Sequence, residues 1–72
     1  MEHAQSYRIR VEGLLDELYS EHLGGMSIST DLGPNAQPRT TLEGRLRDQA
    51  ALSGVLNALY EWHFVVISVE RL

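Results

Sequence analysis

Residues 40–71, TTLEGRLRDQAALSGVLNALYEWHFVVISVER, contain a strand, a helix and a second strand in direct succession. Residues 40–46 alternate, with Leu42 and Leu46 on one face and polar side chains on the other. The next apolar residues recur at helical spacing, and they are Ala51, Leu52, Val55, Leu56, Leu59 and Trp62 or His63. Residues 64–70 alternate again, so a final strand is expected there. This succession predicts an α+β fold.

Asp48 precedes the helix and is predicted to be its N-cap. Its carboxylate can accept hydrogen bonds from free amides of the first turn, and its charge suits the helix dipole. A carboxylate in this place already supplies the negative charge and the acceptor that a bound anion would supply. The clustered glycines of a phosphate loop are also missing. The helix is therefore expected to pack against the sheet without holding a ligand.

The first half of the chain has the same kind of pattern. Residues 7–12 alternate as a half-buried strand, and residues 14–23 place leucines at helical spacing before a glycine pair that ends the segment. Residues 26–31 alternate as a second strand. The prolines, glycine and asparagine of residues 32–39 predict a loop of about eight residues before the next strand.

The order is therefore βαββαβ, within a single domain that spans residues 1–72. Two split βαβ units with right-handed crossovers give a four-stranded antiparallel sheet in the order 4-1-3-2, with both helices on one face. This is the ferredoxin-like sandwich.

Such a sheet leaves its second face uncovered. On the central strands this face is predicted to carry alternating arginine and glutamate side chains, which can form cross-strand ion pairs. Two apolar residues of the last strand are expected on the same face, where exposed apolar side chains often mark a contact surface. The candidate interface consists of Arg8, Arg10, Glu43, Arg45, Phe64 and Val66.

Composition excludes several classes of function. The formal net charge is −4, and all six basic residues are arginines that form no long stripe, which disfavours nucleic-acid binding. The chain has no cysteine, so disulfides and thiolate chemistry are excluded. His3, His22 and His63 lack the spacing of metal ligands, and no serine lies in a nucleophile elbow. No metal, no cofactor and no enzymatic activity are expected.

The first ten residues, MEHAQSYRIR, lack the basic and apolar regions of a secretory signal. No apolar segment approaches the roughly 18 residues that suggest a membrane span. We therefore expect a cytoplasmic protein without a membrane partner.

The chain resembles a family of small uncharacterised bacterial proteins that share a strand of the form YxxRVxGxLD, then DQAALxGLL and a closing LSV. The matching residues are Tyr7, Arg10, Val11, Gly13, Leu15 and Asp16, then Asp48 to Leu52, Gly54 to Leu56, and Ile67 to Val69. The resemblance covers nearly the whole chain, and the DQAAL stretch is its most specific part. Because this family carries no known activity, the resemblance supports the fold alone.

A more distant resemblance is to the ACT regulatory domain, a βαββαβ module that binds amino acids at subunit interfaces. The stretch GLLDEL after the first strand is similar to the ligand loop of that domain, although the usual Asp-x-x-Gly is missing. The candidate ligand junction that this resemblance implies consists of Glu12, Gly13 and Leu14.

Two functions follow. The first is a non-enzymatic interaction domain that forms a homodimer or larger homo-oligomer through the open sheet face or an edge strand. The alternative is an ACT-like module that senses a small molecule such as an amino acid.

Overall fold

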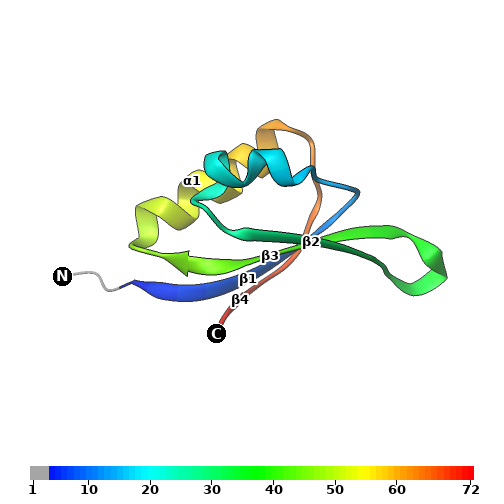
Figure 1. Ribbon diagram of the computed structural model, residues 1–72, viewed down its shortest axis with the longest axis horizontal. Helices are drawn as coiled ribbons and strands as arrows, with labels where there is room; N and C mark the ends of the chain where they lie inside the picture. Colours follow the sequence, from blue (N-terminus) through cyan, green and yellow to red (C-terminus); the bar gives the residue numbers. More distant parts are fainter. Residues whose placement is uncertain (1–3) are drawn as a thin grey trace.

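The computed structural model describes residues 4–72, which form two layers (Figure 1). One layer is a four-stranded antiparallel sheet, and the other contains one α-helix and a 3-10 helix, which cover the same face of the sheet. The α+β class and the antiparallel four-stranded sheet are confirmed. In chain order the elements are β1 (Gln5–Glu12), η1 (Glu17–Leu23), β2 (Ser27–Leu32), η2 (Pro34–Ala36), β3 (Pro38–Leu46), α1 (Gln49–Glu61) and β4 (Val66–Arg71).

The strands lie in the order β2-β3-β1-β4, which reads 4-1-3-2 from the opposite edge. The two central strands, β1 and β3, pair without interruption from Gln5 opposite Leu46 to Glu12 opposite Arg39. The edge strands are β2 and β4. Figure 1 shows the β2–β3 hairpin extending past the helical layer, so its tip is not covered by either helix.

The core lies between the sheet and the helical layer. It contains the predicted apolar face of each central strand together with one face of α1, because alternate strand residues and every third or fourth helix residue point the same way. The buried apolar side chains are Tyr7, Ile9, Val11, Leu15, Leu23, Met26, Ile28, Leu42, Leu46, Val55 and Leu59.

The first helix differs from the α-helix predicted over residues 14–23. It is a 3-10 helix of seven residues that begins only at Glu17. Asp16 is its N-cap and accepts a hydrogen bond from the Leu18 amide, while the Tyr19 amide bonds to the Asp16 carbonyl, as in a 3-10 turn. Apolar spacing alone does not distinguish such a short 3-10 segment from an α-helix.

Thr40 explains why the helix starts late. Its hydroxyl donates to the Gly13 carbonyl at 2.6 Å and accepts from the Leu15 amide at 3.1 Å. These bonds fix the segment between β1 and η1 outside any helix, with Leu15 turned into the core. The side chain of Thr40 is itself fully buried, so a polar group of β3 determines the path of a segment more than 20 residues away in sequence.

The loop between β2 and β3 is shorter than the eight residues predicted. Both strands extend into it, because β2 continues to Leu32 and β3 begins at Pro38. Within the remaining turn, Asn35 and Ala36 have left-handed backbone angles. Pro38 was predicted to lie in the loop, but proline is tolerated as the first residue of a strand.

Asp48 caps α1 as predicted: its carboxylate accepts from the Ala51 amide at 2.8 Å. We expect Asp48→Ala to lower the free energy of unfolding by about 1 kcal/mol, because one amide of the first turn loses its partner. Asp48→Asn keeps an acceptor and should change stability by much less. Urea unfolding of both variants checks this prediction, and equal losses in the two would contradict it.

Within residues 4–72, every helix is too short or too polar to cross a lipid bilayer.

Candidate functional site

The uncovered face of the sheet carries a ladder of ion pairs. Arg8 contacts Glu43 across β1 and β3 at 3.0 Å, and Arg10 contacts Glu70 of β4 at 3.5 Å. Arg45 is exposed farther along β3. Exposed ion pairs such as these contribute only roughly 0–1 kcal/mol each. The paired arginine and glutamate side chains neutralise one another's charges, which is typical of a solvated face.

A third ion pair lies on the β2–β3 hairpin, where Arg39 donates to both carboxylate oxygens of Asp31 at 3.1 Å. The hydrogen bond from Arg39 holds the pKa of Asp31 below its ordinary value, and the same contact raises the pKa of Arg39. The stabilising contact is therefore present at neutral pH and is lost only as the pH falls through the lowered pKa of Asp31.

Phe64 and Val66 lie apart from the ladder, so the expectation that they share its face is wrong. The register of β4 against β1 shifts between Arg10 and Val11, and this bulge places Val66 opposite Val11, which is buried against the helical layer. Phe64 precedes β4 and packs against the core. The extra residue is Ile67. One inserted residue moves the preceding side chains to the other face, which alternation along a single strand does not reveal.

The edge strand β4 and its flanks expose several large apolar side chains. They are Val65, Val66, Ile67, Val69 and Leu72. Natural sheets protect their edges with charges, prolines or covering segments. In β4 the charges are confined to the C-terminal end, at Glu70 and Arg71, whereas the opposite edge strand β2 is mostly polar. The β4 edge is therefore the less protected edge of this sheet.

The hydrogen bonds of β4 determine which of its amides remain free. Leu72 donates to the Ser6 carbonyl at 2.8 Å, and residues directly opposite each other in an antiparallel pair alternate between bonded and non-bonded. Continuing this alternation along the register, Ser68 and Glu70 direct their backbone groups toward β1. Val69 and Arg71 therefore direct theirs away from the sheet, where a further strand can pair.

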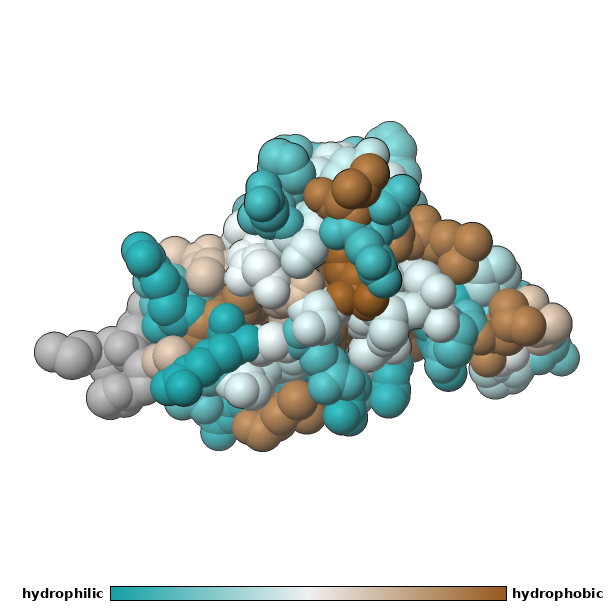
Figure 2. All heavy atoms as spheres, viewed as in Figure 1, coloured by the Kyte–Doolittle hydropathy of each residue, from teal (hydrophilic) through white to brown (hydrophobic). Residues whose placement is uncertain are grey.

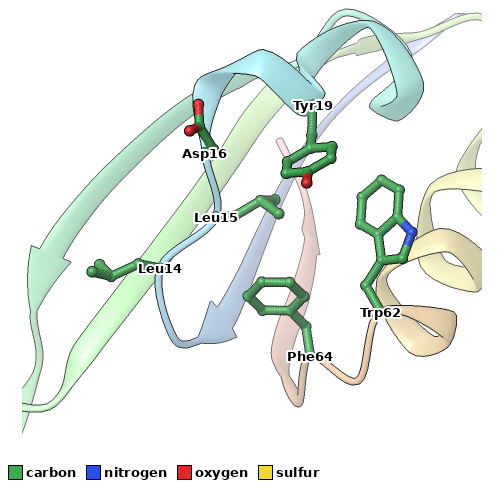
Figure 3. Close-up of a pocket in the computed structure, with 6 residues that line it drawn as sticks. All are labelled: Leu14, Leu15, Asp16, Tyr19, Trp62 and Phe64. Atoms are coloured by element: carbon green, nitrogen blue, oxygen red, sulfur yellow. The ribbon is translucent and has the colours of Figure 1, made fainter.

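An aromatic hollow lies between the start of η1 and the end of α1, near the start of β4 (Figure 3). It has a volume of about 450 Å³ and is lined by Leu14, Leu15, Asp16, Tyr19, Trp62 and Phe64. Figure 3 shows the side chains of Leu15, Tyr19, Trp62 and Phe64 converging on it from three segments of the chain. Figure 2 shows apolar surface gathering over this end of the helical layer.

The backbone holds these aromatic side chains in place. Trp62 is the C-cap of α1 and donates its amide to the Ala58 carbonyl, and the Phe64 amide bonds to the Leu59 carbonyl at 3.0 Å. The rings of Tyr19 and Trp62 lie 4.9 Å apart between centroids. Their position depends on local hydrogen bonds and on ring contacts that join η1 to α1.

The predicted ligand junction is only partly at this hollow. Leu14 lines it, and Gly13 lies directly beside the ring of Phe64. Glu12 instead borders a separate hollow together with Arg39 and Ile67. Tyr19 and Trp62 were not among the predicted site residues, because their positions at helical spacing suggested packing against the sheet. The available signal was the run of aromatic residues at the end of the second helical segment, Tyr60, Trp62 and Phe64.

Metal ligation has no support among residues 4–72, which contain no group of three or more His, Asp or Glu side chains that could hold an ion. His3 lies outside the described residues.

Residues 6–70 match the model of a protein family described as Domain of unknown function (DUF8691). This match covers nearly the whole chain and agrees with the resemblance to an uncharacterised family. No curated protein and no solved structure matches the chain.

Proposed function

This chain belongs to the DUF8691 family, and within it we propose a non-enzymatic interaction domain that self-associates through the edge strand β4. The observation that carries the proposal is an apolar edge strand whose outward amides and carbonyls have no partner strand among residues 4–72. The open sheet face is the less favoured surface, because its arginines and glutamates already pair with each other.

A second copy of this chain is the partner that fits the edge best. Two β4 strands can pair antiparallel about a twofold axis at Val69, where each outward amide meets an outward carbonyl. Val69 then faces Val69 of the second copy, and Ser68 faces its Glu70. This register avoids a like-charge pair. A twofold axis at Glu70 would bring two carboxylates together.

Hydrogen exchange tests this pairing residue by residue. The amides of Val69 and Arg71 are expected to exchange quickly in dilute protein and to slow by roughly tenfold or more in concentrated protein, because only pairing protects them. The amides of Ser68 and Glu70 are the internal control, since their bonds to β1 protect them at both concentrations. Unchanged exchange at Val69 and Arg71 in concentrated protein would contradict the proposed edge.

The second candidate function is small-molecule sensing, which the resemblance to the ACT domain implies. The aromatic hollow beside Leu14 favours it, because small-molecule sites are concave, mostly apolar and carry few polar groups. We also propose that the fold is ferredoxin-like. Two helical segments on one face of the sheet support this proposal, although η1 is a 3-10 helix where that fold has an α-helix.

A further inference from the structure

The side chains that face the aromatic hollow carry no charge. Two leucines and three aromatic rings form its walls, and the sixth lining residue is Asp16. Figure 3 shows the carboxylate of Asp16 pointing away from the rings, and this carboxylate already accepts a hydrogen bond from the Leu18 amide at 2.9 Å. An ionised ligand in the hollow would therefore leave water without an opposite charge to pair with, which is costly.

One polar group lies among these walls. Figure 3 shows the hydroxyl of Tyr19 between the side chains of Leu15, Trp62 and Phe64, whereas the indole nitrogen of Trp62 points away from them. A phenolic hydroxyl can donate one hydrogen bond and accept another. From an uncharged apolar lining with a single hydroxyl, we propose that the hollow binds a neutral aromatic molecule that carries one hydrogen-bonding group.

The walls are held in place and leave apolar surface for a ligand to cover. The rings of Tyr19 and Trp62 contact each other, yet the two residues remain 44% and 37% exposed. The ring of Phe64 is supported from behind by Gly13, where a Cβ would lie only 3.4 Å from Cε1 of that ring. Walls that are already positioned lose little freedom on binding.

An aromatic ligand fits these walls better than an aliphatic one of equal size. Aromatic rings that stack with an offset or meet edge to face attract each other beyond the area that they bury. Ring faces also attract cations, but this attraction is weak at a partly open site and does not replace a paired charge. The volume of about 450 Å³ lies within the range of roughly 300–1,000 Å³ that is typical of small-molecule sites.

This inference rests on the second candidate function, small-molecule sensing, and narrows its ligand class, because an amino acid carries two charges at neutral pH. The probes are phenethyl alcohol, phenethylammonium, 3-phenylpropionate and L-phenylalanine, which share a ring and a two-carbon chain but differ in charge. Trp62 is the only tryptophan of the chain, so its fluorescence reports on the hollow directly. We expect phenethyl alcohol to bind roughly tenfold more tightly than each of the three charged probes.

Tyr19→Phe is the variant that tests the hydrogen bond. Phenylalanine keeps the ring that contacts Trp62 and removes only the hydroxyl. The affinity for phenethyl alcohol should fall roughly three- to tenfold, as expected for the loss of one hydrogen bond. Tyr60→Phe is the matched control, because Tyr60 is exposed and lies outside the lining, and it should leave this affinity unchanged.

The outcomes separate the claims. If a charged probe binds as tightly as the alcohol, the selection of a neutral ligand is overturned, while the hollow stands as a small-molecule site. If Tyr19→Phe weakens binding no more than Tyr60→Phe does, the role of the hydroxyl is overturned. If none of the four probes changes the fluorescence of Trp62 at millimolar concentration, the inference fails as a whole and small-molecule sensing loses the hollow as its site, whereas self-association is unaffected.

Discussion

Thr40→Val is expected to lower the free energy of unfolding by roughly 2–4 kcal/mol, since each buried polar group left without a partner costs about 1–3 kcal/mol. Valine has nearly the same shape, so the loss comes from the hydrogen bonds. The Gly13 carbonyl and the Leu15 amide both lose the hydroxyl that they share. A domain of this size has only several kcal/mol of stability, so the variant should be close to unfolding.

Thr41→Val is the matched control for this experiment. Thr41 is the next residue of β3, and it points to the uncovered face, where its side chain is only partly buried. Urea unfolding should give a change of a few tenths of a kcal/mol for Thr41→Val. Similar losses in the two variants would mean that Thr40 contributes only its strand preference, and the explanation of the late start of η1 would fail.

Gly24→Ala is the second change with a large expected effect. Gly24 ends η1 in the left-handed region at φ +68°, and a Cβ there would lie 2.8 Å from Cδ2 of Leu46, which is buried in the core. The left-handed backbone alone costs a non-glycine residue about 1–2 kcal/mol. Displacing Leu46 adds roughly 1–3 kcal/mol, as in other overpacked cores.

Gly25→Ala separates these two contributions. Gly25 has a similar backbone angle, φ +74°, but a Cβ there would meet no atom within 4 Å. It should therefore show only the backbone cost of about 1–2 kcal/mol. Urea unfolding of both variants measures the difference. Equal losses would show that Leu46 moves aside freely, contrary to the tight packing between η1 and the end of β3.

The sequence predicted the features that depend on nearby residues. The alternation of residues 7–12 and the helical spacing after Asp48 identified β1 and α1, since these patterns are read within one segment. The cap formed by Asp48 was predicted for the same reason. The start of η1 was not predicted, because it depends on Thr40, which is distant in the sequence.

The candidate site was predicted less well than the fold. The bulge at Ile67 depends on how β4 pairs with β1, so the face of Val66 could not be obtained from β4 alone. The hollow joins residues 14–19 to residues 62–64, and these segments meet only in the folded chain. The ladder of ion pairs was predicted on the correct face, because alternation determines the faces of both central strands.

The central claim is that β4 pairs with β4 of a second copy. Light scattering over a wide concentration range tests it most directly, on the wild-type chain, on Val69→Lys and on Leu32→Lys. A lysine at Val69 protects the edge in the way natural edge strands do, while Leu32 is an exposed apolar residue on the opposite edge. We expect twice the mass of one chain for the wild type and for Leu32→Lys, and the mass of one chain for Val69→Lys. A wild-type chain that stays monomeric, or a dimer that survives Val69→Lys, would contradict it.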